Sequence, residues 1–340
     1  MEESDKKTMS FLYQIIMQNN SMPKVSVIIP VYGVEKYIER CARSLFEQTL
    51  TDIEYIFVDD CSPDKSIEIL ERVIEEYRPR FAEEKKVVRI ERMSKNCGLP
   101  AVRKHGIQFC TGEYVIHCDS DDWVDIHMYE KMYNNAKENN ADVVVCDYYS
   151  TDCTNYILVK GIVSTEKEDV IVDILLWRIA ACLWNKLVRR EAYLRNNIKY
   201  PTNNMGEDGA LVVQLLWNTQ KISYLSEPLY YYFYNPASIT NDVTDEKIRQ
   251  RFLQAIANAD IIEEFLVGEK VTRKINDALT KYLFEQSFLI VSLAKHNNED
   301  LKKWRASIDN IKSLVYKCPY LSIKNKLVFY LLLFKSKYLK

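Results

Sequence analysis

Hydrophobic residues along the first 150 positions follow two alternating patterns. The run Val25–Val31 is continuously apolar and rich in β-branched residues, which indicates a strand buried on both faces. Over 35–48 the apolar residues recur at helical spacing, and the same pair of patterns then repeats. Strands that alternate with helices indicate an α/β fold, with a mostly parallel central sheet flanked by helices. The predicted strands are 25–31, 53–58, 87–90, 113–118 and 142–146, and the predicted helices are 35–48, 101–109 and 128–139, with another that opens after 59–64.

Beyond residue 150 the rhythm is less regular. Helical spacing over 169–179 and 206–218 precedes two short strand patterns, 222–225 and 229–233, and from about residue 245 the chain is almost wholly helical. Apolar residues at helical spacing also predict a helix ahead of the first strand. We therefore predict three parts, which are an N-terminal helical extension (1–22), an α/β domain (23–240) and a helical C-terminal region (241–340).

Composition narrows the class of protein. Of the 340 residues, 47% are hydrophobic and only 8 are Gly and 9 are Pro, so the chain is globular and poor in linkers. The net charge of −2 creates no field that would attract nucleic acid, and we predict no such partner. The nine cysteines contain no CxxC pair, which favours reduced thiols in a cytoplasmic protein. The N-terminus lacks the features of a signal peptide.

Polar side chains follow three of the predicted strands. Tyr32 comes after the first strand, Asp59 and Asp60 end the second, and an acidic cluster at 119–122 ends the fourth. In a parallel sheet these positions share one rim, beyond the carboxyl ends of the strands, where such sheets bind ligands. We therefore predict a binding site at this rim.

The cluster of Asp119, Ser120, Asp121 and Asp122 is the strongest chemical signal. Carboxylates two positions apart at a strand end can present oxygens to one hard divalent cation, which commonly shares its shell with substrate phosphates. Without a cation the packed acids would repel each other, and some would be driven to protonate. The alternative is a solvated loop that caps a helix. Its place after a buried strand favours the metal site.

Other rim residues suggest contacts to a nucleotide. One of Asp59 and Asp60 is expected to cap the following helix, and the other to accept a hydrogen bond from a base. Tyr32 could stack on that base, because any base offers a π-face, although a plain rim aromatic is the alternative. Arg103, one turn into a predicted helix, could reach a phosphate; a surface ion pair explains it equally well.

Two later segments carry candidates for catalysis and acceptor binding. Asp208 precedes an apolar helix, where it could cap the helix or act as a general base that takes a proton from an acceptor hydroxyl. Trp184 stands in the segment 183–187 beside polar residues. Sugars stack on indoles, but a tryptophan in such a position also serves as core, and both interpretations stay open.

Together and in order, these stretches resemble the family 2 inverting glycosyltransferases of bacterial polysaccharide and lipopolysaccharide assembly. The resemblance covers roughly 23–240 and depends on the combination, since each motif alone is weak. The matching stretches are VSVIIPVY (25–32), VDDCS (58–62), NCGLPAVRKHGI (96–107), CDSDDW (118–123), WNKL (184–187), GED (206–208) and YYYFYNPASIT (230–240).

This resemblance implies a GT-A (Rossmann-like) fold, a nucleotide-sugar donor that is usually UDP-linked, and Mg²⁺ or Mn²⁺. It implies that Asp119 and Asp121 bind the metal and that Asp208 is the catalytic base. The acceptor would be a hydroxyl of a glycan or a lipid-linked sugar. The residues implied around the donor are Pro30, Tyr32, Asp59, Asp60, Arg103, Asp119, Ser120 and Asp121, and those implied near the acceptor are Trp184, Lys186 and Glu207.

The chain also departs from the family pattern. Pro100 and Val102 stand where small residues are common before the arginine, and Lys104 replaces a frequent asparagine. Phe233 occupies a place often held by arginine, which leaves donor-phosphate contacts from that late motif in doubt but not the class of reaction.

The C-terminal tail combines an apolar run with basic residues. The run 327–334 is framed by five lysines within 324–340, and it is too short to span a bilayer. A basic amphipathic helix that lies on the inner leaflet of the cytoplasmic membrane fits this pattern, because lipid-linked acceptors would be present there. A terminal helix that packs in the core is the alternative.

Two other classes of protein share parts of these signals. A sugar nucleotidyltransferase would need a glycine-rich, basic loop after the first strand, and Val31–Val34 is neither; a dehydrogenase would need GxGxxG at that place. A non-catalytic nucleotide-binding subunit of an assembly complex is a third interpretation. The presence of Asp119, Asp121 and Asp208 favours an enzyme.

Overall fold

A computed structural model describes residues 22–234, 244–294 and 297–337 of the chain. The helix predicted within 1–22 lies outside these residues except for its last position. So does the end of the late motif, from 235 to 240. All of the other predicted elements fall within the described residues.

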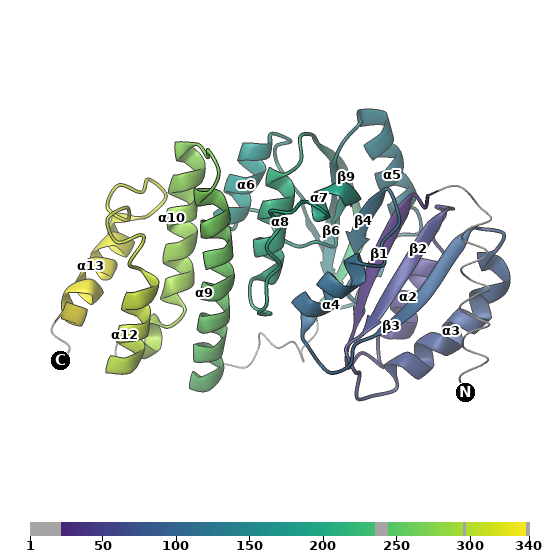
Figure 1. The fold of residues 1–340 in the computed structure, drawn as a ribbon, viewed down its shortest axis with the longest axis horizontal. Coiled ribbons are helices and arrows are strands. Elements are labelled where there is room, and N and C mark those ends of the chain that lie inside the picture. Colours follow the sequence, from purple (N-terminus) through teal and green to yellow (C-terminus); the bar gives the residue numbers. More distant parts are fainter. Residues whose placement is uncertain (1–21, 235–243, 295–296, 338–340) are drawn as a thin grey trace.

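The first half of the sheet is the parallel βα array that the sequence predicts. Strands β1 (Val25–Val31), β2 (Ile53–Asp59), β3 (Lys86–Arg92) and β4 (Tyr114–His117) lie in the order β3-β2-β1-β4, and each neighbouring pair is parallel (Figure 1). Every residue of β1 and β2 is buried, which agrees with their continuously apolar sequences. The parallel array brings the carboxyl ends of β1, β2 and β4 to one rim.

The second half of the sheet is mixed. From β4 the order continues through β8, β6 and β9 to β5, and a further strand, β7, pairs with β6. The pair β6–β9 is parallel, whereas β4–β8, β6–β8, β6–β7 and β5–β9 are antiparallel. The two short strands predicted over 222–233 form one strand, with a register irregularity opposite Cys146 and Asp147. The bounds are β5 Trp123–Val124, β6 Val143–Thr151, β7 Tyr156–Val159, β8 Lys186–Arg189 and β9 Ile222–Phe233.

Helices cover both faces of the sheet. Helices α2, α3 and α5 pack on one face, against the side chains of Val25, Val27, Ile29 and Val31. Helices α4, α6 and α8 pack on the other face, where Ile28 of β1 contributes to the core. The bounds are α2 Ile38–Phe46, α3 Ser66–Phe81, α4 Leu99–Ile107, α5 Met128–Asn139, α6 Lys167–Leu175, α7 Arg190–Tyr193 and α8 Glu207–Trp217.

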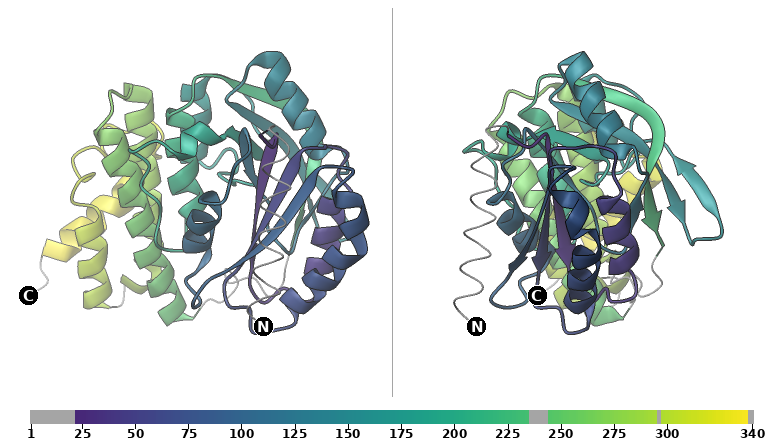
Figure 2. Two further views of the ribbon diagram at one scale, coloured as in Figure 1. Left: turned by 45° about the vertical axis from the view of Figure 1, so that its right-hand side comes forward. Right: turned by 90° about the vertical axis from the view of Figure 1, so that its right-hand side faces the viewer.

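The C-terminal region is helical, as the sequence predicts. Its helices stack beside α6 and α8, on the side of the sheet away from α2 and α3 (Figures 1 and 2). One continuous cluster of buried residues runs from the sheet through these helices to Phe329 and Leu332. The C-terminal region therefore shares a core with the α/β part. The bounds are α9 Asp245–Val267, α10 Arg273–Phe288, α11 Val291–Ala294, α12 Asn298–Ser307 and α13 Ile323–Lys337.

Candidate active site

The ends of β1 and β2 form one side of the rim. The backbone N–H of Asp60 donates to the carbonyl of Val31 at 3.0 Å, so the two strand ends stay joined past the last ladder pair. The Asp59 carboxylate accepts a hydrogen bond from the Ser62 N–H at 2.8 Å. Tyr32 extends from this edge with 51% of its surface exposed. Tyr32 and Asp59 thus lie together at the rim, as the strand order predicts.

Asp60 and the helix after β2 differ from the prediction. Both oxygens of Asp60 accept backbone N–H groups, from Cys97 at 2.7 Å and from Gly98 at 2.9 Å. Asp64, which lies just before α3, accepts the N–H of Ser66, the first residue of that helix, at 3.0 Å. Neither Asp59 nor Asp60 caps this helix, and Asp60 holds the segment ahead of α4 instead of facing outward.

That segment requires a glycine. Gly98 precedes α4 with a φ of +83°, a conformation that side chains with a Cβ rarely adopt. A Cβ at this position would also lie 2.8 Å from Oδ1 of Asn204, and the same oxygen accepts the N–H of Leu99 at 3.2 Å. The start of α4 is therefore fixed between Asp60 on one side and the segment before α8 on the other.

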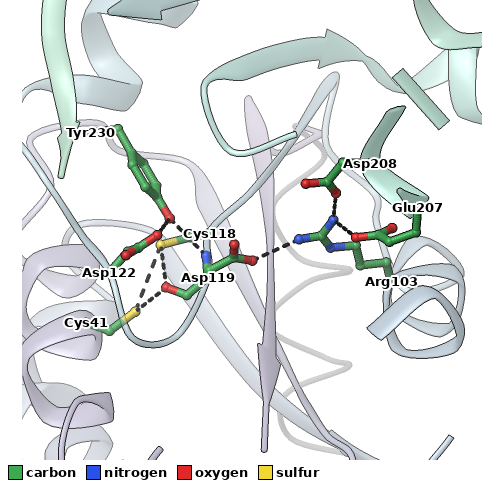
Figure 3. A network of polar contacts seen from close by, with 8 residues as sticks. All are labelled: Cys41, Arg103, Cys118, Asp119, Asp122, Glu207, Asp208 and Tyr230. Carbon is green, nitrogen blue, oxygen red and sulfur yellow. Dashed lines mark hydrogen bonds and ion pairs between the residues drawn. The ribbon is translucent and has the colours of Figure 1, made fainter. Parts of the chain in front are cut away.

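Arg103 of α4 joins three carboxylates (Figure 3). Its Nη2 donates to Asp119 Oδ1 at 2.9 Å, and its Nη1 forms ion pairs with Glu207 and Asp208 at the start of α8. The side chain of Arg103 is 2% exposed, whereas those of Asp119 and Asp208 are 27% and 29% exposed. The guanidinium is thus ion-paired, as one of the two predicted interpretations has it, although it is buried among carboxylates and not at the surface, and it brings the strand end of Asp119 next to Asp208.

Glu207 is the buried member of this network. Its side chain is 2% exposed, and burial raises its pKa from the usual 4.5 to about 7, while the charge of Arg103 acts in the opposite direction. Its Oε2 atom is buried and makes no hydrogen bond within the described part of the chain. The side chain of Glu207 is therefore too buried to contact an acceptor in this structure, and it forms an ion pair with Arg103. This corrects its assignment to the acceptor side.

The acidic cluster is tied to β9. Oδ2 of Asp122 accepts the hydroxyl of Tyr230 at 2.6 Å, and Oδ1 accepts the backbone N–H of Phe233 at 2.7 Å. The hydroxyl of Tyr230 in turn accepts the N–H of Asp119 at 3.1 Å (Figure 3). Burial, and then the charges of Asp121 and Asp119, raise the pKa of Asp122 well above its usual value. Asp122 thus anchors the turn, and Asp119 remains partly open to solvent.

The match to known proteins decides the class of this site. Residues 26–198 match the family described as glycosyl transferase family 2. The chain belongs to this family. EpsJ of Bacillus subtilis, described as an uncharacterized glycosyltransferase, is 31% identical over 252 residues, which cover 69% of this chain and 70% of EpsJ. The chain is thus a family 2 glycosyltransferase, as its motifs indicate.

Solved structures show the same fold. Residues 1–349 of Staphylococcus aureus TarS, in complex with UDP-GlcNAc, align with a TM-score of 0.55 at 20% identity, over 85% of this chain and 89% of that TarS fragment. The mannosyltransferase PcManGT of Pyrobaculum calidifontis, in complex with GDP-Man and Mn²⁺, aligns with a TM-score of 0.54 at 13% identity, over 97% of this chain and 88% of that one. The GT-A fold implied by the motifs is therefore confirmed.

Arg40 contacts the acidic cluster, although the sequence did not single it out. Its Nη2 donates to the carbonyl of Asp121 at 2.7 Å. Its guanidinium lies 3.8 Å from the ring centre of Trp123 and 4.9 Å from that of Phe233. Arg40 comes from α2, 81 positions away from Asp121. Nothing in the local sequence around Arg40 marks it, because the contact exists only once α2 packs beside β5.

Lys186 and Trp184 are interior residues. Lys186 is 1% exposed, and its Nζ donates to the carbonyls of Ala180 at 3.1 Å and Cys182 at 2.9 Å and to Asn185 Oδ1 at 2.8 Å. Trp184 is 5% exposed and stacks on Tyr230 with ring centres 4.2 Å apart. The predicted acceptor contact of Lys186 is wrong for this structure, because its three N–H groups hold the loop before β8. Of the two interpretations left open for Trp184, its burial agrees with that of a core residue.

Two further residues assigned to the donor are enclosed. Pro30 lies in the fully buried strand β1, paired with Val58 of β2. Ser120 is 6% exposed. Neither side chain opens onto the rim. Among the donor residues, Tyr32 is 51% exposed and Asp119 and Asp121 are partly exposed, whereas Asp59 is 8% exposed and lies at the end of its buried strand.

The carboxylate oxygens at the rim are ligands of the kind that a hard divalent cation prefers. Within the described ranges no three His, Cys, Asp or Glu side chains gather as a complete metal-binding group. Mg²⁺ and Mn²⁺ need fewer protein ligands than that, because they keep waters and share substrate phosphates. Asp119 and Asp121 lie close enough to Asp122 for their charges to raise its pKa. This crowding of carboxylates is the condition that a bound cation relieves.

Proposed function

We propose that this chain is an inverting glycosyltransferase that moves a sugar from a nucleotide-sugar donor, a UDP-sugar, to a hydroxyl of a glycan or lipid-linked acceptor in cell-surface polysaccharide synthesis. The observation that carries the proposal is the arrangement around Arg103. The guanidinium of Arg103 contacts both Asp119 and Asp208. Asp119, proposed to lie near the diphosphate, and Asp208, proposed as the base, are therefore held next to each other. The UDP-GlcNAc in TarS supports the donor class.

In this proposal Asp208 is the general base. One of its oxygens is held by Arg103, and the other points away from the guanidinium (Figure 3). The acceptor hydroxyl gives its proton to Asp208, its oxygen forms the new bond to the anomeric carbon, and the bond from that carbon to the diphosphate breaks. Attack from the face opposite the leaving group inverts the anomeric centre. A base in this role contributes roughly 10²–10⁴ in rate.

Asp119 and Asp121 would hold Mg²⁺ or Mn²⁺, and the cation in PcManGT supports this assignment. When bound, such a cation supplies charge neutralisation for the departing nucleoside diphosphate. The protein's own contribution is orientation. Arg103 holds Oδ1 of Asp119, and Arg40 holds the carbonyl of Asp121, so both aspartates are positioned by buried or stacked guanidinium groups.

Tyr32 and Asp59 would bind the base of the donor. Tyr32 is half exposed at the end of β1, which supports stacking of a base on its ring. Asp59 uses Oδ1 for the N–H of Ser62. Its position beside Tyr32 suits a hydrogen bond from a base N–H. Asp60 would act indirectly, by shaping the segment that leads to Arg103.

A donor screen tests the reaction. The purified protein is incubated with Mn²⁺, individual nucleotide sugars, and either octyl glycosides or membrane extract, and released nucleoside diphosphate is measured. We expect release from a UDP-sugar that depends on the cation. No release from any donor would overturn the proposal, and pyrophosphate release from a nucleoside triphosphate and a sugar phosphate would identify a nucleotidyltransferase.

Variants then test the roles. Asp208→Asn should lower kcat by roughly 10²–10⁴ while UDP affinity, measured by calorimetry, is kept. Asp309→Asn, an exposed aspartate after α12, is the matched control and should turn over as wild type does. Full turnover by Asp208→Asn would refute the base assignment. Unimpaired UDP binding without transfer in the wild type would point to a non-catalytic nucleotide-binding subunit.

We further propose that the enzyme binds peripherally to the cytoplasmic face of a membrane through α13. No helix in the described part of the chain is long and apolar enough to cross a bilayer. One side of α13 packs in the core through Phe329, which is fully buried, while Ile323, Leu327 and Leu331 are 79%, 61% and 69% exposed along the opposite side. The tail thus packs in the core on one side, and its exposed apolar row supports the proposed membrane contact on the other.

The positive charge of the tail indicates that the exposed apolar row contacts an anionic lipid surface. Residues 310–340 contain seven lysines and no acidic residue, although the whole chain has a net charge of −2. Flotation with vesicles of phosphatidylcholine alone or mixed with phosphatidylglycerol tests this. The double variant Leu327→Glu, Leu331→Glu should lose binding to the anionic vesicles, while Leu194→Glu, at an exposed leucine outside the tail, should keep it. Equal flotation of both variants would refute the tail as the contact.

A further inference from the structure

Three aromatic rings form a stack beside the acidic cluster. Trp184 stacks on Tyr230 with ring centres 4.2 Å apart and planes 13° apart, and on Tyr232 at 5.7 Å and 14°. Tyr148 packs against the indole edge-on at 4.6 Å. Tyr230 and Tyr232 are two positions apart on β9, so their side chains leave the same face of the sheet. The stack is therefore fixed on a strand on one side and on the loop before β8 on the other.

The stack runs from the interior to the surface. Tyr230 is fully buried and Trp184 is 5% exposed, whereas Tyr232 is 39% exposed. Tyr232 is thus the end of the stack that solvent reaches. Because the ring of Tyr232 already packs on the indole of Trp184, it would lose little further side-chain entropy when a ligand binds.

The exposed ring is coupled to the predicted catalytic centre. Two residues of β9 close to Tyr232 bind Asp122, Tyr230 through its hydroxyl and Phe233 through its backbone N–H. The charges of Asp122, Asp121 and Asp119 act on Tyr232 and, together with burial as the main cause, raise its pKa. Tyr232 therefore lies at the edge of the acidic cluster and is held there by the same contacts that fix the cluster.

A flat, half-exposed aromatic ring at this place suits one class of ligand. The C–H face of a pyranose is apolar and planar enough to stack on an aromatic ring, while its hydroxyls stay in water. Asp208 lies across Arg103 from Asp119, whereas Tyr232 is joined to the cluster through Asp122. From these positions we infer that Tyr232 is a sugar-binding platform that orients the acceptor glycan. This inference rests on the proposed glycosyl transfer.

Trp184 has a supporting role in this subsite. The indole was a candidate for the acceptor contact, but its burial leaves the ring of Tyr232 as the exposed face of the stack. The acceptor class is thus a pyranose glycan, either free or attached to a lipid, since stacking on Tyr232 uses the sugar ring and not the aglycone.

Steady-state kinetics of the full-length protein test the subsite. The donor is the UDP-sugar that gives the most UDP release, and the acceptor is the most active octyl glycoside or the membrane extract. Tyr232→Ala should raise the acceptor KM about 10-fold or more, the size of effect expected for loss of one ring stack, with little change in kcat at saturating acceptor. UDP affinity and the slow hydrolysis of donor without acceptor should stay as in wild type. Tyr232→Phe should retain the wild-type acceptor KM.

Controls separate binding from folding. Tyr234→Ala removes a more exposed tyrosine from the same chain segment, 56% exposed, and should leave the acceptor KM unchanged. Tyr232→Leu keeps the apolar bulk without a flat ring, and it serves if Tyr232→Ala is poorly folded; it should also raise the acceptor KM. An unchanged acceptor KM, or an equal rise in donor KM, overturns the subsite. No transfer by the wild type overturns both this inference and the proposed function.

Discussion

Glu207→Gln should change how the stability of this protein depends on pH. Glu207 is nearly fully buried and ion-paired to Arg103, and burial raises its pKa to about 7. In the unfolded chain the same carboxyl titrates near its usual value of 4.5. Between those two values the folded state holds a proton that the unfolded state has lost. The free energy of unfolding therefore falls as pH rises through this window.

The magnitude follows from the two pKa values. A shift from 4.5 to about 7 spans about 2.5 units, and each unit corresponds to about 1.36 kcal/mol. The wild type should thus lose about 3 kcal/mol of stability from this group between pH 4 and pH 8. Glutamine has nearly the same shape, keeps an oxygen for Arg103 and does not titrate. The difference in stability between variant and wild type should grow by about 3 kcal/mol across the window.

Urea unfolding at a series of pH values measures this difference. Other groups titrate in the same range, so the quantity of interest is the variant minus the wild type at each pH, which removes contributions that both share. Glu138→Gln, at an exposed position near the end of α5, controls for the loss of one surface charge. If the curves of wild type and Glu207→Gln run parallel from pH 4 to 8, Glu207 does not titrate as its burial implies.

Three further substitutions test other parts of the site. Arg40→Gln removes the donor to the Asp121 carbonyl and should raise the Mn²⁺ concentration for half-maximal activity about 10-fold, measured by metal titration. Lys186→Met removes the buried ammonium that donates to the carbonyls of Ala180 and Cys182 and to Asn185 Oδ1, and should lower the free energy of unfolding by roughly 2–4 kcal/mol in urea; a loss below 1 kcal/mol would contradict this role. Gly98→Ala should destabilise by about 1–3 kcal/mol, measured by thermal unfolding, because of its positive φ and the contact with Asn204.

The first half of the fold was predictable because its strands are buried on both faces. Such strands appear in the sequence as continuous apolar runs, and β1 has the predicted bounds. β9 was divided in two because Ser226, Glu227 and Pro228 interrupt its pattern, yet the strand continues through a register irregularity against β6. The strands β5, β7 and β8 are two to four residues long, too short for a periodic pattern to identify.

The site was predictable in part for a similar reason. Parallel strands bring their ends to one rim, so the convergence of Tyr32, Asp59 and Asp119 follows from strand order alone. Ion pairs depend on packing between distant elements. Arg103 and Asp208 are 105 positions apart, and only the approach of α4 to α8 determines that they meet. Lys186 is polar in sequence, and its burial follows from the loop that folds around it.

The charge arrangement around Arg103 argues that cation and donor bind together. Arg103 brings one positive charge to the two partly exposed carboxylates of Asp119 and Asp208, so negative charge predominates where a diphosphate would have to bind. These carboxylates and a bound diphosphate would repel each other strongly once water is displaced from between them. A divalent cation held by Asp119 and Asp121, as proposed, would neutralise negative charge on the diphosphate side. UDP affinity should therefore fall steeply when the cation is removed, and Asp119→Asn should weaken that dependence.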